Sequence, residues 1–303
     1  MDKYIGLEEI LDKSRIKYNE PMSKHTTVRV GGPCDCLVLP ESIEEIKNII
    51  AYAKKNDLKY YVIGNGSNLL VVDEGIHALV IKITNKFASV TVEDDVIIAN
   101  AGASVPYVSL LAKQNSLTGF EFACGIPGTI GGGVRMNAGA YGGEIKDIFV
   151  EATYLDGEGN ICKIEKKDMD FGYRHSFFSD KPEYVILSVK FKLQKGDITE
   201  ITSKMEENST SRKTKQPLEY PNFGSVFKRP EGYFVGKLVD DAGLRGYTIG
   251  GAQVSEKHTG FIINKENATC QDIVDLIRHV QKTVYDKFGV SLKTEVVFIG
   301  GEI

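Results

Sequence analysis

Two glycine-rich segments contain the residues best suited to binding a phosphate-bearing ligand. The first, residues 64–68, reads Gly-Asn-Gly-Ser-Asn and follows the apolar run Tyr60–Ile63. Successive small residues let neighbouring backbone N–H groups point into one concavity, where they bind phosphate oxygens. A tight turn would use the same residues, so both interpretations stay open for this segment alone. A Rossmann loop is excluded, because the third glycine is missing and Leu69–Val72 indicates a short strand or turn.

The second segment, residues 125–143, is much richer in glycine. Such a density is costly inside a helix or strand, because glycine loses more backbone entropy on folding than other residues. Close approach of the backbone to a large flat ligand would explain it. A flexible loop is the alternative, but Ile126, Val134, Met136 and Tyr141 are unlike the polar content of such loops. We therefore favour ligand contact.

Residue type alone does not single out Arg174, Ser225 or Glu295 for chemistry. A guanidinium can direct two N–H groups toward a carboxylate oxygen. Each residue also has an ordinary explanation when taken singly. Arg174 could form an ion pair, Ser225 could be a turn hydroxyl after a glycine, and Glu295 could be a charge at a strand edge.

Composition limits the class of protein. The chain has 303 residues, 42% hydrophobic and 26% charged, which predicts two or three domains. A net charge of -4 gives no broad attraction to nucleic acid or to an anionic membrane. The N-terminus lacks the apolar stretch of a signal peptide or membrane span, so we expect a cytoplasmic protein. Five cysteines without a Cys-x-x-Cys pair predict reduced thiols, and the five histidines show no metal-ligand spacing.

Apolar periodicity changes repeatedly between helical and strand-like segments, without a regular βαβ rhythm, and predicts an α+β fold. A capping box at Ser42–Glu45 is expected to begin a helix, and Thr269 is expected to cap another whose apolar stripe ends at Phe288. Residues 196–217 are strongly polar and predict an exposed helix or connector beside a domain boundary near residue 200. Helices are predicted at 42–55, 105–114 and 270–288, and strands at 60–63, 96–99, 149–155, 184–193 and 292–299.

At the level of motifs, the chain closely resembles the bacterial UDP-N-acetylenolpyruvoylglucosamine reductases. The matching stretches follow one another in order along almost the whole chain. They are Thr26–Pro33, Gly64–Leu70, Gly125–Gly143, Gly172–Phe178, Asn222–Lys228, Ala252–His258 and Glu295–Gly300.

The resemblance implies an FAD-binding domain of the vanillyl-alcohol-oxidase type followed by a C-terminal α+β substrate-binding domain. We expect residues 1–200 to form the FAD-binding region, as two subdomains divided near residue 85. Residues 201–303 would form the substrate-binding domain, with the last strand returning to the active site. The implied cofactor contacts are Gly64, Asn65, Gly66, Ser67, Asn68, Ile126, Pro127, Gly128, Thr129, Gly131, Gly132, Asn137, Ala138, Gly139 and Arg212.

The family's activity implies that NADPH and the enolpyruvyl nucleotide sugar use one pocket in turn. Arg174 and Glu295 would stabilise the enolate-like species, and Ser225 would protonate the neighbouring carbon. The candidates for substrate contact are Tyr141, Tyr173, Lys215 and Arg229. Solvated surface charge is the alternative for Arg212 and Lys215. We expect His175 to be scaffolding beside Arg174, and His258 is a candidate loop contact.

Several positions depart from the family's usual pattern. Gly133, Phe223 and Thr294 stand where alanine, a small residue and proline are common, and Phe223 is expected to reshape the pocket beside Ser225. The short stretch after Arg174 resembles the compact type, which lacks a tyrosine-bearing loop. Two alternatives remain, another FAD-linked oxidase and a non-catalytic flavin or nucleotide-sugar binding protein. Small-molecule partners, a monomeric state and no protein-built metal site are expected.

Overall fold

The computed structural model describes residues 2–301 and divides into two compact units. Unit 1 comprises residues 1–18, 36–65 and 78–212, and unit 2 comprises residues 19–35, 66–77 and 213–303. Two short N-terminal runs therefore belong with the C-terminal part of the chain in unit 2. The predicted division near residue 200 into functional domains stays a prediction.

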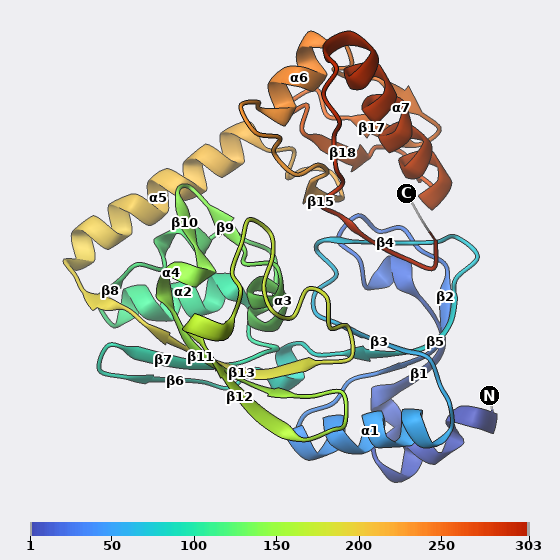
Figure 1. Cartoon of the computed structure of the whole chain (residues 1–303), viewed down its shortest axis with the longest axis vertical. Helices are drawn as coiled ribbons and strands as arrows, with labels where there is room; N and C mark the ends of the chain where they lie inside the picture. Colours follow the sequence, from blue (N-terminus) through green and yellow to red (C-terminus); the bar gives the residue numbers. More distant parts are fainter. Residues whose placement is uncertain (1, 302–303) are drawn as a thin grey trace. The chain divides into compact units, whose positions relative to one another are not determined.

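Unit 1 is built on a five-stranded antiparallel sheet in the order β12-β11-β13-β7-β6. The helices α2, α3 and α4 lie together on one side of this sheet (Figure 1). The predicted strands at 96–99, 149–155 and 184–193 and the predicted helix at 105–114 are confirmed. The bounds are β6 Val90–Glu93, β7 Val96–Asn100, α2 Val105–Gln114, α3 Ile130–Arg135, α4 Ile145–Ile148, β11 Phe149–Leu155, β12 Ile161–Glu165 and β13 Val185–Lys192.

A second sheet has the order β1-β2-β5-β3, with β3 and β5 parallel. The unit boundaries fall within β1, β2 and β5, so their residues divide between the units. The bounds are β1 Ile16–Pro21, β2 Pro33–Val38, β3 Tyr60–Ile63 and β5 Ile76–Lys82. Short two-stranded pairs in unit 1 are β8 Leu117–Thr118 with β14 Gln194–Lys195, and β9 Gly139–Ala140 with β10 Gly143–Glu144.

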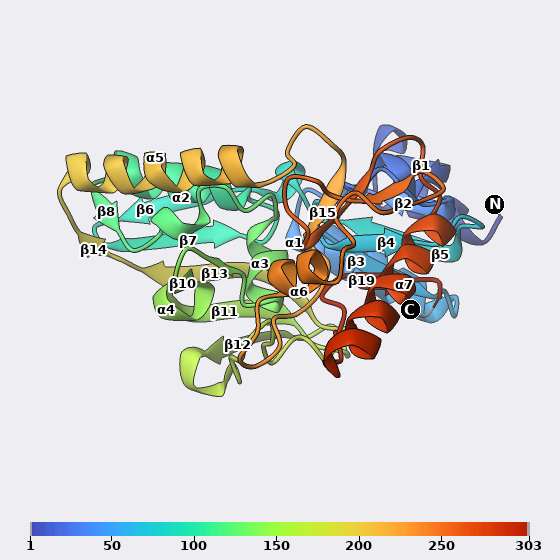
Figure 2. The same cartoon turned by 90° about the horizontal axis from the view of Figure 1, so that it is seen from above.

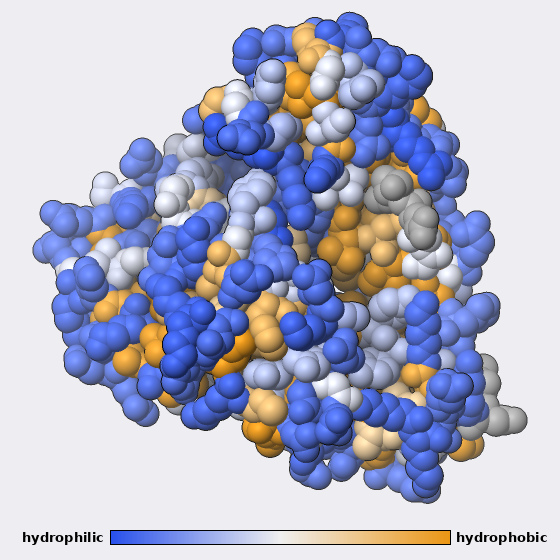
Figure 3. Space-filling model, in the orientation of Figure 1, coloured by the Kyte–Doolittle hydropathy of each residue, from blue (hydrophilic) through white to orange (hydrophobic). Residues whose placement is uncertain are grey.

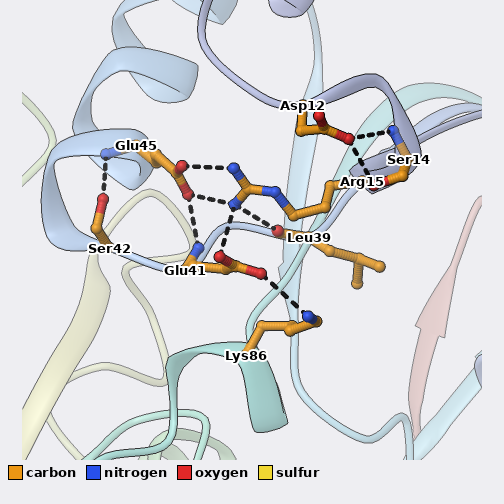
Figure 4. A network of polar contacts seen from close by, with 8 residues as sticks. All are labelled: Asp12, Ser14, Arg15, Leu39, Glu41, Ser42, Glu45 and Lys86. Carbon is orange, nitrogen blue, oxygen red and sulfur yellow. Dashed lines mark hydrogen bonds and ion pairs between the residues drawn. The ribbon is translucent and has the colours of Figure 1, made fainter.

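Helix α1 (Ile43–Lys55) begins as predicted, because the Ser42 hydroxyl accepts the Glu45 N–H at 3.1 Å. The capping box itself is wrong in its second half. The Glu45 carboxylate accepts the N–H of Glu41 at 2.7 Å and both terminal nitrogens of Arg15 at 2.7 Å (Figure 4). An ion pair with a residue distant in sequence thus replaces the local bond, a competition that the capping motif cannot reveal.

Unit 2 contains a four-stranded antiparallel sheet in the order β15-β18-β17-β16, and α7 packs on β16 and β17. A parallel pair of β4 and β19 completes its strands. The short strand predicted after the first glycine segment is thereby confirmed as β4. The bounds are β4 Leu69–Val71, β15 Asn222–Ser225, α6 Val235–Asp241, β16 Thr248–Ile249, β17 Ala252–Val254, β18 Phe261–Asn264, α7 Cys270–Phe288 and β19 Val297–Ile299.

Helix α7 shows its predicted cap with a full capping box, since Thr269 Oγ1 accepts the Asp272 N–H at 3.0 Å and Asp272 accepts the Thr269 N–H at 2.9 Å. Gly289 ends the helix in the left-handed region, with φ 67°. Ile273, Ile277, Val280 and Val284 of its apolar stripe are at most 1% exposed, but Phe288 is 39% exposed, so its assignment to the core is wrong. Phe288 is the last residue of α7, and a side chain at a helix end is less enclosed by its neighbours than one in the middle.

The predicted last strand is also too long. Only Val297–Ile299 pairs with β4, and Glu295 lies before β19 rather than in it. Each unit has its own hydrophobic core, and residues from the two units do not mix in these cores. On the face shown in Figure 3, hydrophilic residues cover most of the surface of both units.

The polar stretch before residue 217 forms α5 (Ile198–Lys215), a long regular helix (Figure 2) on which only Ile201 and Asn208 are buried. The prediction of an exposed helix is therefore confirmed. All five cysteines are free thiols. None of the helices in residues 2–301 has the length and apolar character needed to cross a membrane.

Candidate functional site

The second glycine-rich segment includes a short helix, although its glycine density argued against one. Helix α3 contains Gly131, Gly132 and Gly133, and the Thr129 hydroxyl caps it by accepting the Gly132 N–H at 3.4 Å. A Cβ on Gly131 would stand 2.9 Å from the Ala101 Cβ. Glycine is needed there because the backbone packs against the end of β7. Protein packing, and not a ligand, explains this one position.

Gly132 differs from its neighbour. Its residue is exposed, and an added Cβ would meet only the Thr129 hydroxyl, at 3.5 Å. Gly131 is tied to the sheet by its N–H, which bonds the Ala101 carbonyl at 2.9 Å, whereas Gly132 presents backbone to the outside. This exposed backbone gives a flat ligand a surface without side chains.

The first glycine segment follows β3 as predicted. In unit 1, a Cβ on Gly64 would stand 2.3 Å from the Thr129 hydroxyl, so the end of β3 lies directly against the cap of α3. In unit 2, Gly66 has φ 67° and packs on the carbonyl of His25, which a Cβ would approach to 2.0 Å. Both glycines are therefore required by close backbone approach.

The amides of this segment suit an anion. Within residues 2–301, no hydrogen bond is formed by the backbone N–H groups of Asn65, Gly66 and Ser67, and these residues are at least partly shielded. Shielded backbone donors are normally paired, so consecutive donors without an acceptor are suited to a ligand that brings its own oxygens. A pyrophosphate fits this donor set, because it supplies several oxygens close together. A tight turn, the alternative interpretation, would not explain why these consecutive N–H groups have no acceptor.

Arg212 lies beside the second glycine segment in unit 1. A Cβ on Gly125 would stand 2.8 Å from Arg212 Cδ. Burial lowers the pKa of the Arg212 guanidinium, and the phenol of Tyr141 opposes that shift. No carboxylate pairs with this side chain in the described part of the chain. A partly desolvated cation without a carboxylate is a better phosphate ligand than a solvated surface charge would be.

Arg174 occupies a tight turn in unit 1. Gly172 and His175 form an antiparallel bridge around it, and its φ of 53° is in the left-handed region that non-glycine residues rarely adopt. Its Nη2 donates to the Gly139 carbonyl at 3.3 Å, and its guanidinium lies 5.0 Å from the centre of the Tyr173 ring. The structure thus brings Arg174, Tyr173 and Gly139 together. The His175 ring contacts Asp170 at 3.3 Å, in keeping with a scaffolding role.

Asn137 is fully buried, and protein groups use its whole side chain. Its amide nitrogen donates to Glu144 at 3.1 Å and to the Gly172 carbonyl at 2.9 Å, while its oxygen accepts the Lys146 N–H at 3.0 Å. The Asn137 side chain is therefore not exposed to a cofactor, and its predicted cofactor contact stays a prediction. The side chain instead fixes the turn that carries Arg174.

Ser225 lies at the end of β15 in unit 2. The pairing of β15 with β18 shifts register between Asn222 and Ser225, and Gly224 in the irregular stretch has φ 84°. Regular alternation would put residues 223 and 225 on one face. The bulge breaks this rule, so Phe223 is 2% exposed in the core of unit 2 while Ser225 is exposed. The Phe223 ring thus lies in the core, and the expectation that it reshapes a pocket beside Ser225 is wrong.

Glu295 is fixed by its backbone beside Ser225. The Glu295 N–H donates to the carbonyl of Val226 at 2.8 Å, and the Asn68 side chain donates to the Glu295 carbonyl at 3.0 Å. The Oε2 atom of its carboxylate is shielded from solvent. Within unit 2, Asn68 of the first glycine segment therefore joins the residues next to Ser225.

The remaining residues expected to contact a ligand are Lys215, Arg229 and His258. Lys215 is exposed, and Arg229 donates to the Tyr233 carbonyl at 3.2 Å and lies 3.9 Å from the centre of the Phe234 ring. His258 is half-buried; burial lowers its pKa, and Nδ1 accepts the Gly260 N–H at 3.1 Å. The predicted contacts of Lys215, Arg229 and His258 stay predictions.

Two small residues were missed by sequence reasoning. Ala101 and Ala103 accept the N–H groups of Gly131 and Ile130 and so fix the start of α3. The signal was available in the sequence Ala101-Gly102-Ala103, since a run of small residues after a predicted strand indicates close backbone packing.

Comparisons with known proteins agree with this geometry. Residues 34–165 match the family described as "FAD binding domain", and residues 216–299 match "UDP-N-acetylenolpyruvoylglucosamine reductase, C-terminal domain". Together with the amide-lined segment and the exposed glycine backbone, these matches define an FAD-dependent oxidoreductase. The predicted fold class, an α+β FAD-binding domain followed by a C-terminal α+β domain, is confirmed.

Relatives identify the family. A UDP-N-acetylenolpyruvoylglucosamine reductase of Caldanaerobacter subterraneus is 49% identical over 294 residues, covering 97% of each chain. Its counterpart in Clostridioides difficile is 48% identical over 299 residues, covering 99% of this chain and 98% of the relative. A crystal structure of the Thermus caldophilus reductase has a TM-score of 0.81 at 33% identity and covers 94% of this chain and 98% of that one. The chain belongs to the UDP-N-acetylenolpyruvoylglucosamine reductase family.

Proposed function

We propose that this enzyme reduces the enol-ether double bond of UDP-N-acetylenolpyruvylglucosamine to the lactyl ether of UDP-N-acetylmuramate, with NADPH as the electron donor. The observation that supports this best is the arrangement in unit 2. Asn68 of the amide-rich segment is bonded to Glu295, whose N–H is bonded to the residue after Ser225. The proposed phosphate-binding segment, a carboxylate and a hydroxyl are thereby linked through hydrogen bonds to the Glu295 backbone.

The reaction balances with two electrons and two protons added across the double bond. When bound, FAD would supply the hydride chemistry that links NADPH to the terminal methylene carbon of the enolpyruvyl group. The neighbouring carbon, which bears the carboxylate, then gains negative charge and must be protonated. The protein must therefore stabilise an enolate and provide one proton.

We assign these tasks to three side chains. The permanently charged guanidinium of Arg174 would bind the substrate carboxylate, where negative charge increases during hydride transfer. Glu295, with one carboxylate oxygen shielded from solvent, would polarise the same group. Ser225 would donate the proton. Its hydroxyl has no hydrogen-bond partner among residues 2–301, which leaves it available to a substrate.

The cofactor would be held mainly by backbone. The amides of residues 65–68 would bind the pyrophosphate, with Arg212 as a further phosphate ligand, and the exposed backbone at Gly132 and the partly buried backbone at Gly139 would face the flat ring system. Such donors add fixed dipoles without adding charge. Tyr141 and Tyr173, which are 42% and 48% exposed, would contact the nucleotide sugar with Lys215 and Arg229. A cytoplasmic location and a monomeric state remain predictions.

Anaerobic stopped-flow spectroscopy tests the proposed function. The purified enzyme is first reduced with one equivalent of NADPH, and the loss of flavin absorbance is followed. Mixing with the enolpyruvyl nucleotide should restore oxidised flavin rapidly and yield the lactyl product. UDP-N-acetylglucosamine, which lacks the double bond, is the control and should restore nothing. Reduction without reoxidation by the enolpyruvyl nucleotide would contradict the assignment and favour another flavin-linked role.

A further inference from the structure

The turn that carries Arg174 begins a longer loop, residues 172–184, which leads into β13; we refer to it as the Arg174 loop. Three residues of the second glycine segment, spaced two apart, bond this loop. Gly139 accepts a hydrogen bond from Arg174, the Asn137 side chain donates to Gly172, and Arg135 contacts the part that follows. The loop is thus attached to the segment against which we propose that the flavin lies.

Arg135 makes the largest share of these bonds. Its Nη1 donates to the Phe178 carbonyl, and its Nη2 donates to the carbonyls of Tyr184 at 2.8 Å and Lys181 at 3.3 Å. The backbone carbonyl of Arg135 accepts the hydroxyls of Ser176 at 2.8 Å and Ser179 at 3.1 Å. One residue therefore bonds five positions of the loop.

This guanidinium is unusual in its partners. All the acceptors recorded for it are backbone carbonyls, and none of the carboxylates in residues 2–301 forms an ion pair with it. Burial lowers the pKa of Arg135, and the negative charge of Glu183 opposes that shift. A partly buried cation bound only to carbonyls specifies their positions through its planar fork, because a misplaced carbonyl would leave a charge without compensation.

The conformation of Arg174 depends on the contacts of its loop. The backbone at Arg174 is in the left-handed region, a conformation that persists only when surrounding contacts enforce it. On one side the turn is held by Asn137 and by the Gly172–His175 bridge. On the other side the chain enters the stretch Ser176–Tyr184, in which Arg135 bonds five positions and the rings of residues 177, 178 and 184 pack on Tyr154.

We infer that Arg135 is a positioning residue, which fixes the Arg174 loop against the glycine segment so that the Arg174 guanidinium meets the substrate carboxylate. This inference rests on the proposed function. It predicts a specific kinetic defect. Arg174 is needed when the enolate forms but not when NADPH reduces the flavin, so only the second half-reaction depends on the position of the loop.

The main test uses Arg135→Met in the FAD-loaded enzyme. Stopped-flow measurement should show reduction by NADPH within about twofold of the unchanged enzyme and reoxidation by the enolpyruvyl nucleotide slowed by about 10- to 100-fold, the range expected for misplacement of a catalytic group. Arg135→Lys keeps the charge without the planar fork and should recover part of the loss. Equal slowing of both half-reactions, or no change in either, would overturn the inference.

A matched control is Arg15→Met, which removes another partly buried guanidinium of unit 1. Arg15 bonds Glu45 and the Leu39 carbonyl (Figure 4), and none of its recorded bonds reaches the Arg174 loop. This variant should lower stability while leaving the ratio of the two half-reaction rates unchanged. If Arg15→Met changed that ratio as Arg135→Met does, the effect would be general loosening of unit 1 and the inference would fail.

Hydrogen exchange separates this inference from the proposed function. In Arg135→Met, backbone amides of residues 172–184 should exchange at least about tenfold faster, while amides of β7 and β11 keep their rates. Unchanged exchange in the loop would overturn the positioning role whatever the enzyme reduces. If the unchanged enzyme failed to reduce the enolpyruvyl nucleotide, the proposed function would fall, while faster exchange would still show that Arg135 holds the loop.

Discussion

The two units hold their proposed catalytic groups by different kinds of contact. In unit 1, side chains hold the Arg174 loop: Arg135 and Asn137 bond carbonyls of the loop, and Arg174 bonds Gly139. In unit 2, Ser225 is placed by a strand bulge, and Glu295 by a backbone bond to Val226 and one side-chain bond from Asn68. Side-chain bonds can be deleted one at a time by substitution, whereas backbone bonds survive it. The position of Arg174 should therefore be more easily disturbed than that of Ser225 or Glu295.

The largest expected effect is on the chemistry of unit 2. Ser225→Ala should slow product-forming reoxidation of the flavin by about 10²- to 10⁴-fold, the usual contribution of a general acid. Reduction by NADPH should stay unchanged, because the bulge that presents residue 225 is made by backbone. The measurement is anaerobic stopped-flow of both half-reactions. Thr248→Ala, which removes an exposed hydroxyl from the same sheet, is the control. Normal turnover in Ser225→Ala would remove the serine from the mechanism.

Two adjacent glycines of α3 give the next largest effect. Gly131→Ala would force a Cβ to 2.9 Å from Ala101, and should lower the free energy of unfolding by about 1–3 kcal/mol. Gly132→Ala meets only the Thr129 hydroxyl at 3.5 Å, so the apoprotein should keep its stability or gain up to about 1 kcal/mol from helix propensity.

The pair also tests the proposed flavin surface. If the flavin lies over Gly132, Gly132→Ala should weaken FAD binding by at least about tenfold, equivalent to about 1.4 kcal/mol. Thermal melting of the apoproteins and quenching of flavin fluorescence measure the two quantities. An FAD affinity unchanged in Gly132→Ala would place the flavin elsewhere.

Helix caps allow a smaller comparison between the units. The full box of Thr269 and Asp272 begins α7 in unit 2, while α1 in unit 1 has only the Ser42 half. We expect Thr269→Ala to lower the free energy of unfolding by about 1–2 kcal/mol and Ser42→Ala by about 0.5–1 kcal/mol. Urea denaturation measures both. A larger loss for Ser42→Ala would show that the Glu45 ion pair depends on that cap.

The smallest expected effect is the pH dependence of unit 1. Hydrogen bonds from Arg15 lower the pKa of Glu45 below its usual value, so the folded state favours the ionised carboxylate. The resulting stability, about 0.5 kcal/mol for a partly exposed pair, is fully present above the unfolded pKa near 4.3 and is lost as the pH falls through the folded pKa. Denaturation of Arg15→Met between about pH 7 and pH 3 should show a smaller loss. An identical pH profile would contradict this.

Local signals made much of the fold predictable. Strand β3, helix α2 and strand β11 have the bounds that apolar periodicity indicated, and Thr269 caps α7 as predicted. Predictions failed where a distant partner competed with a local motif. The Glu45 carboxylate bonds Arg15 in place of the Ser42 N–H that a capping box requires. Glu295 bonds Val226 and Asn68 and lies outside the last strand. Neither partner is near in the sequence, so no window along the chain could have found it.

The sequence by itself determined the chemistry that this protein can contain: small residues where backbone must approach a ligand, and the guanidinium, hydroxyl and carboxylate that the reaction needs. Only the tertiary structure decided which glycine serves packing and which leaves exposed backbone, and that Arg135 bonds the Arg174 loop. The physical reason is that residue type fixes what a group can donate or accept. The identity of its partner depends on distances between segments far apart in the chain.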